Sequence, residues 1–248
     1  MSAPTAIYIN GLTVSFGGFV AINNLTMEIL YGQVRAIIGP NGAGKTTLLD
    51  VVTGKTKPQK GEVFLDKDKN ILGQSEPITA RQGIGRKFQK PSVFEQLTVL
   101  DNLELAARGH TGIWDMIKST LSPGEAKRID SILDTISLSN SKNEHAGSLS
   151  HGQKQWLEIG MLLVQNPKVL LLDEPVAGMS DYETKRTAEL IRSLKTPERA
   201  VVVIEHDMDF VAEIADMVTV MHEGKILMEG TMDKVKSHPQ VMEVYLGR

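Results

Sequence analysis

The feature that most constrains how this chain of 248 residues can fold is a glycine-rich stretch at residues 39–47. An apolar run at residues 34–38 precedes it, and an amphipathic segment at residues 48–52 follows it. A strand, a glycine-rich turn and a helix in this order are the context in which the pattern G-x-x-x-x-G-K-[ST] binds phosphate. The glycines permit the positive φ angles that turn backbone N–H groups toward an anion. The sequence therefore predicts a loop that holds the phosphates of a nucleotide.

Two side chains of this loop can contribute to nucleotide binding in addition to its backbone N–H groups. Lys45 can reach the β- and γ-phosphates of a nucleotide, and the hydroxyl of Thr46 can be a ligand of Mg²⁺. The helix that starts near Lys45 adds the positive end of its dipole. A chance glycine turn is the alternative, but the flanking strand and helix disfavour it. The residues expected to hold the nucleotide are Gly39, Pro40, Asn41, Gly42, Ala43, Gly44, Lys45, Thr46 and Thr47.

A second apolar run, at residues 169–172, ends in two carboxylates, Asp173 and Glu174. A buried strand here can deliver Asp173 beside the phosphate loop, where Mg²⁺ needs oxygen ligands. Glu174 is then placed to polarise a water that attacks the γ-phosphate. The alternative is a strand that ends in two solvated acids, and the phosphate loop earlier in the chain makes that alternative weaker.

Composition narrows the class of protein. Hydrophobic residues make up 41% of the chain and charged residues 23%, as in ordinary globular proteins, and the net charge of −3 does not favour nucleic acid as a partner. The absence of cysteine excludes disulfides and thiolate metal sites. No apolar run is long enough to span a bilayer and no export signal is visible, so we expect a cytoplasmic location. A small basic cluster is interpreted as a solvated flank: Arg81, Arg86, Lys87 and Lys90.

The hydrophobic pattern changes twice along the chain. Residues 6–16 and 21–29 predict antiparallel strands, and residues 98–165 predict helices without a strand. Strands and helices alternate again from residue 167 onward. We therefore predict one α/β domain, in which residues 1–90 and 166–248 form the nucleotide-binding core and residues of about 91–165 form a helical insertion. Helix starts are predicted at Thr98, Ser122, Ser150 and Ser180, the last three with a capping box.

The pentapeptide Leu-Ser-His-Gly-Gln at residues 149–153 is the most discriminating motif. It resembles the signature of the ATP-binding subunits of ABC transporters, which is usually written L-S-G-G-Q. The resemblance implies the ABC ATPase fold: a P-loop NTPase with a parallel sheet core, an antiparallel β subdomain and a helical subdomain. It also implies that the signature covers the nucleotide held by a partner subunit. The residues concerned are Ser150, His151, Gly152 and Gln153.

Other residues of the family pattern follow in the family's order. The resemblance implies that Gln89 contacts Mg²⁺ and the attacking water, and that His206 contacts the γ-phosphate. It implies that Phe16 stacks on adenine, although Tyr8 and Phe19 lie nearby and a core role for Phe16 is an alternative. Residues 178–181 occupy the position of the loop through which the two subunits communicate. His151 replaces a glycine, and its ring either points outward without a role or assists closure of the subunit pair.

Residues 84–105 resemble the branched-chain amino acid and urea importer branch. The form Arg-Lys-Phe-Gln-Lys-Pro in this stretch, together with residues 149–159 and 174–179, looks closest to the urea importers. The resemblance implies an ATPase that binds ATP and Mg²⁺ and powers uptake of urea. A branched-chain amino acid importer, or a non-transport ABC ATPase, is the alternative. The implied partners are transmembrane permease subunits, a second ATP-binding subunit (a related different chain or a second copy) and, indirectly, a solute-binding protein, with no nucleic acid. The implied place is the cytoplasmic side of the inner membrane, as a peripheral protein.

A short apolar segment is a candidate for contact with the permease. It follows the expected glutamine loop, and it either docks the permease or covers the local core. The residues of this segment are Pro91, Val93, Phe94 and Leu97.

Overall fold

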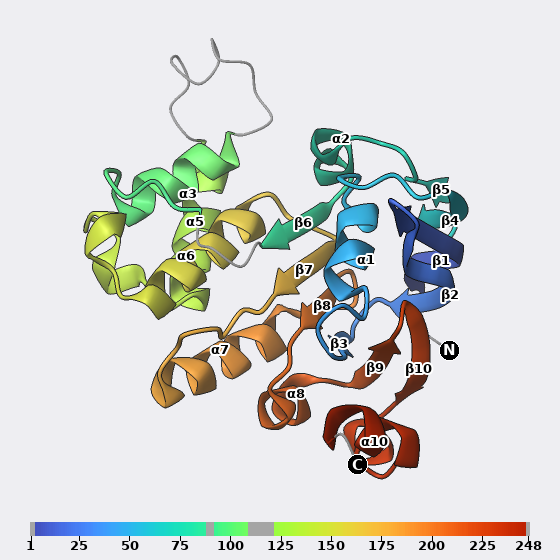
Figure 1. The fold of residues 1–248 in the computed structure, drawn as a ribbon. Coiled ribbons are helices and arrows are strands. Elements are labelled where there is room, and N and C mark those ends of the chain that lie inside the picture. Colours follow the sequence, from blue (N-terminus) through green and yellow to red (C-terminus); the bar gives the residue numbers. More distant parts are fainter. Residues whose placement is uncertain (1–2, 88–91, 109–121, 247–248) are drawn as a thin grey trace.

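The computed structural model describes residues 3–87, 92–108 and 122–246, which form two sheets with helices around them (Figure 1). The smaller sheet has the strand order β2-β1-β4-β5, and the larger one has the order β10-β9-β3-β8-β7-β6. The predicted fold class is confirmed: a parallel core, an antiparallel sheet and a group of helices occur in one chain.

The smaller sheet is antiparallel. Its first two strands form the predicted hairpin, but each is longer than the sequence pattern suggested. Gly17 and Gly18 have φ angles of 52° and 92°, which a two-residue turn between twisted strands requires. The strands are β1 (Thr5–Phe16), β2 (Phe19–Leu30), β4 (Lys60–Leu65) and β5 (Lys69–Asn70).

The larger sheet is parallel except for one edge strand, which pairs antiparallel to its neighbour. Its inner strands are covered on both faces, which explains their continuous Val, Ile and Leu content. The strands are β3 (Val34–Ile38), β6 (Ile84–Lys87), β7 (Val169–Asp173), β8 (Ala200–Ile204), β9 (Met217–His222) and β10 (Lys225–Gly230). The ends of β3, β7 and β8 lie at one edge of this sheet, so the residues that follow them can meet.

Capping boxes start four of the described helices, at the four positions that the sequence predicts, and the Asp207 side chain caps α8. Thr98, Ser122, Ser150 and Ser180 each make a capping box with the residue three positions later. The short helix α9 was not predicted. The helices are α1 (Lys45–Val52), α2 (Glu76–Arg81), α3 (Val99–Ala107), α5 (Pro123–Thr135), α6 (His151–Val164), α7 (Asp181–Leu194), α8 (Met208–Ile214), α9 (Met232–Lys236) and α10 (Pro239–Leu246).

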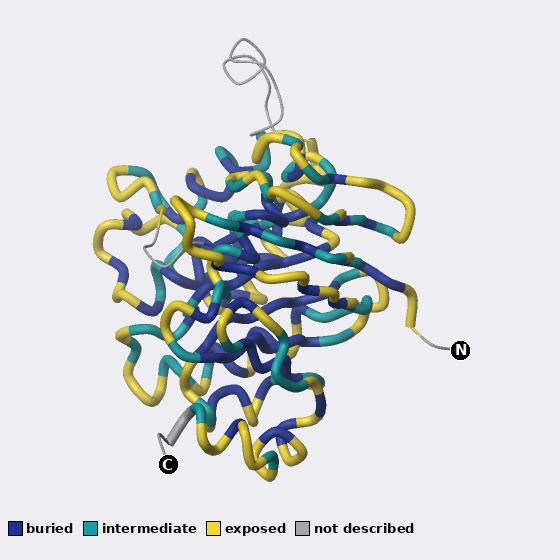
Figure 2. Tube along the Cα trace, turned by 45° about the vertical axis from the view of Figure 1, so that its right-hand side comes forward, coloured by how far each residue is buried: buried dark blue, intermediate teal, exposed yellow. Residues whose placement is uncertain are grey.

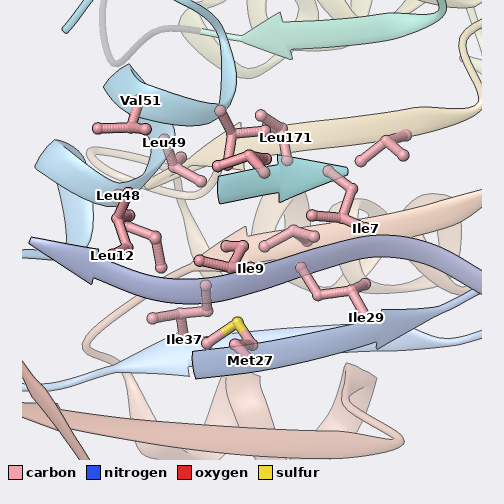
Figure 3. Close-up of a cluster of buried hydrophobic side chains, with 14 of the residues drawn as sticks. Ile7, Ile9, Leu12, Met27, Ile29, Ile37, Leu48, Leu49, Val51 and Leu171 are labelled. Atoms are coloured by element: carbon pink, nitrogen blue, oxygen red, sulfur yellow. The ribbon is translucent and has the colours of Figure 1, made fainter. Parts of the chain in front are cut away.

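Helix α1 lies between the two sheets and joins their cores (Figure 3). Its Leu48 and Leu49 belong to one buried cluster with Ile9 of β1, Ile37 of β3 and Leu171 of β7. Figure 2 shows that the buried part of the chain runs through the centre of the molecule. Because α1 follows the glycine-rich loop directly, this packing fixes the position of the loop.

A second buried cluster covers the other face of the larger sheet. Leu157 and Leu163 of α6 pack in it with Leu170 and Leu172 of β7. The same cluster includes residues of α3, α5 and α7. Helix α6, which starts at the signature pentapeptide, is therefore held against the sheet as well as against the other helices.

The interpretation of Arg86 and Lys87 as a solvated flank is wrong. Arg86 is 9% exposed and Lys87 is 0% exposed. Arg86 pairs with Asp50 and Asp173, and the Nζ atom of Lys87 lies 3.8 Å from Glu158 Oε2 on α6. Carboxylates on other elements thus compensate both charges inside the protein. Arg81 is exposed, as expected, and Lys90 lies outside the described residues.

Candidate functional site

The glycine-rich loop packs so closely against its neighbours that two of its glycines cannot be replaced without displacement. A Cβ atom on Gly39 would lie 2.2 Å from the Met221 carbonyl oxygen, and one on Gly44 would lie 2.5 Å from that of Ala21. Both residues also have positive φ angles, of 154° and 99°. The glycines at these two positions are therefore required by space and by backbone conformation.

Lys45, the first residue of α1, turns its side chain back over the loop. Its Nζ atom donates to the carbonyl oxygens of Gly39 at 2.6 Å and Pro40 at 3.0 Å. Burial lowers the pKa of Lys45, and the nearby carboxylates of Glu174 and Asp173 oppose that shift. The arrangement holds a cation at the place where the motif puts the phosphates.

Asp173 ends β7 as a buried carboxylate that is 2% exposed. Its Oδ2 atom accepts a bond of 3.2 Å from Arg86 Nη2, and Arg86 Nη1 pairs with Asp50 of α1 at 2.5 Å. Burial raises the pKa of Asp173, and Arg86 opposes the rise. The side chain is thus fixed at the sheet edge by a guanidinium that also reaches α1.

The other oxygen of this carboxylate fits a metal ion. Asp173 Oδ1 is buried and has no hydrogen-bond partner. No group of three or more His, Cys, Asp or Glu side chains that could hold a metal occurs in the described parts of the chain. Mg²⁺ is usually bound by one or two protein oxygen ligands together with phosphate oxygens and water, and the free oxygen of Asp173 can be one of them. Thr46 and Asp173 are the described candidates, and Gln89 lies outside the described residues.

Glu174 follows with a φ angle of 46°, which is unusual for a residue with a side chain. Its N–H donates to the Ile204 carbonyl oxygen at the end of β8. A left-handed conformation of this kind is commonly maintained at functional positions by the surrounding structure. It turns the chain sharply after β7 and leaves the Glu174 side chain 28% exposed.

His206 follows β8 and lies beside Glu174. Its Nδ1 atom is 4.0 Å from Glu174 Oε1 and 3.9 Å from Glu205 Oε2, and 69% of its side chain is exposed. Glu205 is buried, which raises its pKa, and its carboxylate accepts from the N–H groups of Val176 and His206. The imidazole is thus a solvent-exposed group beside two carboxylates.

A cavity of about 290 Å³ joins the loop to an aromatic wall. Phe16 and Phe19 line it and are 51% and 63% exposed, whereas Tyr8 stacks on Phe64 with ring centroids 6.4 Å apart. The lining that the described residues provide is Phe16, Phe19, Ala21, Asn41, Gly42, Ala43, Gly44, Lys45, Thr46, Thr47 and Glu174. The predicted loop, Phe16 and Glu174 are therefore brought together, and Phe19 is a second aromatic candidate.

The signature residues are not part of this lining. Ser150 caps α6, and its Oγ atom donates to Glu183 Oε1 on α7 at 2.8 Å. Gln153 completes the cap by accepting from the Ser150 N–H. The N-terminus of α6, with Gly152 in its first turn, thus forms a separate polar surface from the cavity beside Lys45.

Sequence reasoning missed Arg86, Glu183 and Glu205 as parts of the site. Arg86 pairs with Asp50 and Asp173, which lie 36 and 87 positions away. No local pattern encodes such contacts. A usable signal for Glu205 was its place directly before His206, at the end of a strand neighbouring that of Asp173.

Known proteins with similar sequences and structures were found over the whole chain. The protein-family model described as "ABC transporter" matches residues 22–177. The high-affinity branched-chain amino acid transport ATP-binding protein LivG of Escherichia coli (strain K12) is 36% identical, with 100% of this chain and 99% of that protein covered. BraF of Pseudomonas aeruginosa, which carries the same description, is 35% identical with the same coverage. A crystal structure of the ADP conformation of an ATP-binding cassette of an ABC transporter gives a TM-score of 0.87 at 32% identity, covering 98% of this chain and 99% of that one.

Proposed function

This chain belongs to the ABC transporter family, and we propose that it is the ATP-hydrolysing subunit of an importer for branched-chain amino acids. As a member of this family it is an ATPase that binds ATP together with Mg²⁺. The observation that supports branched-chain amino acids as the solute is the full-length similarity to LivG and BraF. These relatives support the amino acid alternative better than the urea expectation. Urea stays the second candidate, because residues 84–105 have the form that resembles urea importers.

We propose roles for the site residues that the positions of the described ones support. Lys45 and the loop N–H groups would hold the phosphates, and Thr46 and Asp173 would hold Mg²⁺, which supplies positive charge against the phosphates when it is bound. Gln89, which lies outside the described residues, is assigned to Mg²⁺ by the family resemblance alone. Glu174 takes a proton from the attacking water, and His206 contacts the γ-phosphate. The left-handed backbone of Glu174 and the proximity of His206 support this assignment.

Two further contacts complete the proposed binding site. Phe16 stacks on the adenine ring from the aromatic wall of the cavity. The signature of a second ATP-binding subunit covers the same nucleotide, and Ser150, His151, Gly152 and Gln153 do this for the nucleotide of the partner. The separation of these four residues from the cavity beside Lys45 supports a site shared by two subunits.

We propose that the permease docks at the groove between the helical insertion, residues of about 91–165, and the core, residues 1–90 and 166–248. A groove of about 310 Å³ is lined by Pro77 of α2, Arg86 of β6 and Leu162 of α6, among others. Phe94 belongs to the helical insertion and is 51% exposed, but it lies outside the lining of this groove. Val93 packs against the second buried cluster, and Leu97 is half-buried. Pro91 lies outside the described residues. Within the described part of the chain no helix could cross a membrane, and we propose peripheral attachment through the permease.

Uptake of labelled leucine and labelled urea tests this function in cells whose own copy is replaced by a Glu174→Gln variant. We expect leucine uptake to be lost and ATP hydrolysis by the purified complex to fall by roughly 100-fold or more, because the amide cannot accept the proton. Glu198→Gln is the matched control, because Glu198 is exposed and precedes β8, at the opposite edge of the sheet. Loss of urea uptake alone would move the protein to the second candidate. Unchanged uptake of both solutes would refute the proposal.

A further inference from the structure

The sequence contains two Asn-Gly dipeptides, Asn10-Gly11 in β1 and Asn41-Gly42 in the phosphate loop. Asparagine is among the chemically least stable residues, and a glycine after it has no side chain that could hinder attack on its amide. The backbone nitrogen of the glycine can then attack the side-chain carbonyl carbon of the asparagine. The surroundings of each dipeptide decide whether its nitrogen is free to do so, and the two sites differ in this respect.

Hydrogen bonds hold both reacting groups of the Asn10 site. The Gly11 N–H donates to Thr26 Oγ1 at 3.1 Å, and Asn10 Nδ2 donates to Glu62 Oε2 at 3.3 Å. A Cβ atom on Gly11 would lie 3.4 Å from Asn24 Oδ1, so a neighbouring side chain also covers the glycine. Attack at this site would require β1 to open locally first.

The Asn41 site lies at the open tip of the phosphate loop. Both of its residues are exposed, and within the described parts of the chain neither the Asn41 side chain nor the Gly42 N–H makes a hydrogen bond. Apart from the chain neighbours of Gly42, no described atom lies within 4 Å of a Cβ atom placed on this glycine, whereas Gly39 and Gly44 are closely packed. The reacting groups of this site are thus neither paired nor covered.

We propose that Asn41 is a deamidation site that reacts when the phosphate loop is empty and is protected when a nucleotide is bound. The Gly42 nitrogen forms a bond to Asn41 Cγ, the Cγ–Nδ2 bond breaks, and the proton of the Gly42 nitrogen leaves with Nδ2 as ammonia. Water then opens the cyclic imide, which leaves aspartate or isoaspartate at position 41. The reaction consumes water and releases ammonia, and nothing is oxidised or reduced.

The nucleotide and the deamidation compete for the same backbone group. A phosphate that accepts from the loop N–H groups would hold the Gly42 nitrogen and keep it from Asn41. The product opposes the nucleotide in turn, because Asn41 and Gly42 line the cavity beside Lys45 and a carboxylate there repels phosphate. Isoaspartate also lengthens the backbone of a loop whose other glycines are closely packed. Subunits without nucleotide should therefore lose the ability to bind it.

The test incubates the purified full-length chain at mildly alkaline pH, with and without ADP and Mg²⁺, and follows both dipeptides by mass spectrometry of peptides. Asn10 is the matched site in the same molecule. Without nucleotide, Asn41 should convert at least about tenfold faster than Asn10, because no hydrogen bond has to break at Gly42. ADP at about ten times its Kd should slow the conversion of Asn41 by about tenfold, the factor by which the empty loop becomes rarer, and should not affect Asn10. In guanidinium chloride the two sites should convert at similar rates.

Variants connect the modification to nucleotide binding. Asn41→Asp, which places the same carboxylate in the loop, should weaken ADP binding by about tenfold or more, whereas Asn10→Asp should leave it unchanged. Asn41→Gln cannot form the same imide ring, so its affinity for ADP should not decline during the incubation. The proposal is overturned if Asn41 converts no faster than Asn10, if ADP leaves its rate unchanged, or if the converted protein binds ADP normally. None of these results bears on the solute or on uptake, so they leave the proposed function standing.

Discussion

Arg86 Nη2 lies 3.2 Å from Asp173 Oδ2, and the two side chains are only 4% and 3% exposed. The same guanidinium pairs with Asp50 of α1, so one cation serves two carboxylates on different elements. The pair joins the helix after the phosphate loop to the strand that ends in the proposed metal ligand. Asp173 Oδ1 has no hydrogen-bond partner in the described structure, so this oxygen is available to a metal ion.

Replacing Arg86 with Met should destabilise the protein by about 3–5 kcal/mol, because it removes this cation from the buried Asp173 carboxylate, whereas Asp50 keeps Lys55 at 3.6 Å. Denaturation by guanidinium chloride measures this change. Arg81→Met, at an exposed position on α2, should change stability by less than about 0.5 kcal/mol. Equal effects of the two substitutions would mean that the buried pairs contribute nothing to stability.

A second prediction concerns Gly152 and Gly124, which both lie in the first turn of a helix behind a capping serine. A Cβ atom on Gly152 would lie 2.5 Å from Glu183 Oε1, whereas the nearest atom to one on Gly124 is 4.0 Å away. Gly124→Ala should therefore stabilise the protein by about 0.5–1 kcal/mol through its higher helix propensity. Gly152→Ala should lack this gain, because Glu183 must leave Ser150.

We also expect the rate of ATP hydrolysis to differ between Gly152→Ala and Gly124→Ala. We expect Gly152→Ala to lower ATP hydrolysis by the complex at least about tenfold, since roughly 1.4 kcal/mol of lost positioning has that effect. Gly124→Ala should hydrolyse ATP at the natural rate. The idea fails if Gly152→Ala is as stable and as active as Gly124→Ala.

The Glu158 carboxyl on α6 gives the third prediction. Burial raises the pKa of Glu158 to about 7, and Lys87, the cation beside it, opposes the shift. Between pH 4.5, the ordinary pKa of the group, and about pH 7, the Glu158 carboxyl is therefore protonated in the folded protein and ionised in the unfolded chain. The contribution of this group to stability is fully present below pH 4.5 and is lost as the pH rises through 7.

Glu158→Gln cannot titrate, so the stability of the natural protein should fall relative to this variant as the pH rises from 4.5 to above 7, by on the order of 3 kcal/mol. Denaturation at a series of pH values measures the difference. Glu189→Gln is the control, because Glu189 makes an exposed pair with Arg186 on α7. A difference between the natural protein and Glu158→Gln that stays constant with pH would contradict the assignment.

The fourth prediction distinguishes the two aromatic residues in the cavity wall. Stacking of a base on an aromatic ring is worth about 1–3 kcal/mol, so Phe16→Ala should weaken ATP binding by about 5- to 150-fold. Phe19→Ala should have a smaller effect, and Tyr8→Ala none, because Tyr8 stacks on Phe64. Titration of each variant with ATP measures its affinity for the nucleotide and so distinguishes the two phenylalanines. A larger loss for Phe19→Ala would assign the stacking role to Phe19.

Local patterns explain what the sequence could predict. The caps at Ser122, Ser150 and Ser180 depend on residues three positions apart, and the strand before Asp173 depends on one apolar run. Contacts between distant elements could not be predicted. The charges of Arg86 and Lys87 indicated exposure, and only the folded arrangement brings Asp50, Asp173 and Glu158 to them. The five-residue helix α9 is too short for a periodic pattern.

The solute is the other part that local patterns could not decide. None of the described residues is identified by its chemistry as a binding site for urea or an amino acid distinct from the ATP site. The resemblance of residues 86–91, 149–159 and 174–179 pointed to urea, whereas the comparison over the full length favours relatives named for branched-chain amino acids. A few short segments are thus a poorer guide to the solute than the whole chain.

The two bonds from Lys45 Nζ to the carbonyls of Gly39 and Pro40 have a kinetic consequence. They brace the loop with the chain's own groups, in addition to the close packing of Gly39 against Met221 and of Gly44 against Ala21. The loop is therefore largely preorganised for a nucleotide, and it loses little conformational entropy when the nucleotide binds. Capture of ATP should then proceed at a rate limited by diffusion into the cavity, and the slow steps of the cycle should lie in the meeting and parting of the subunits.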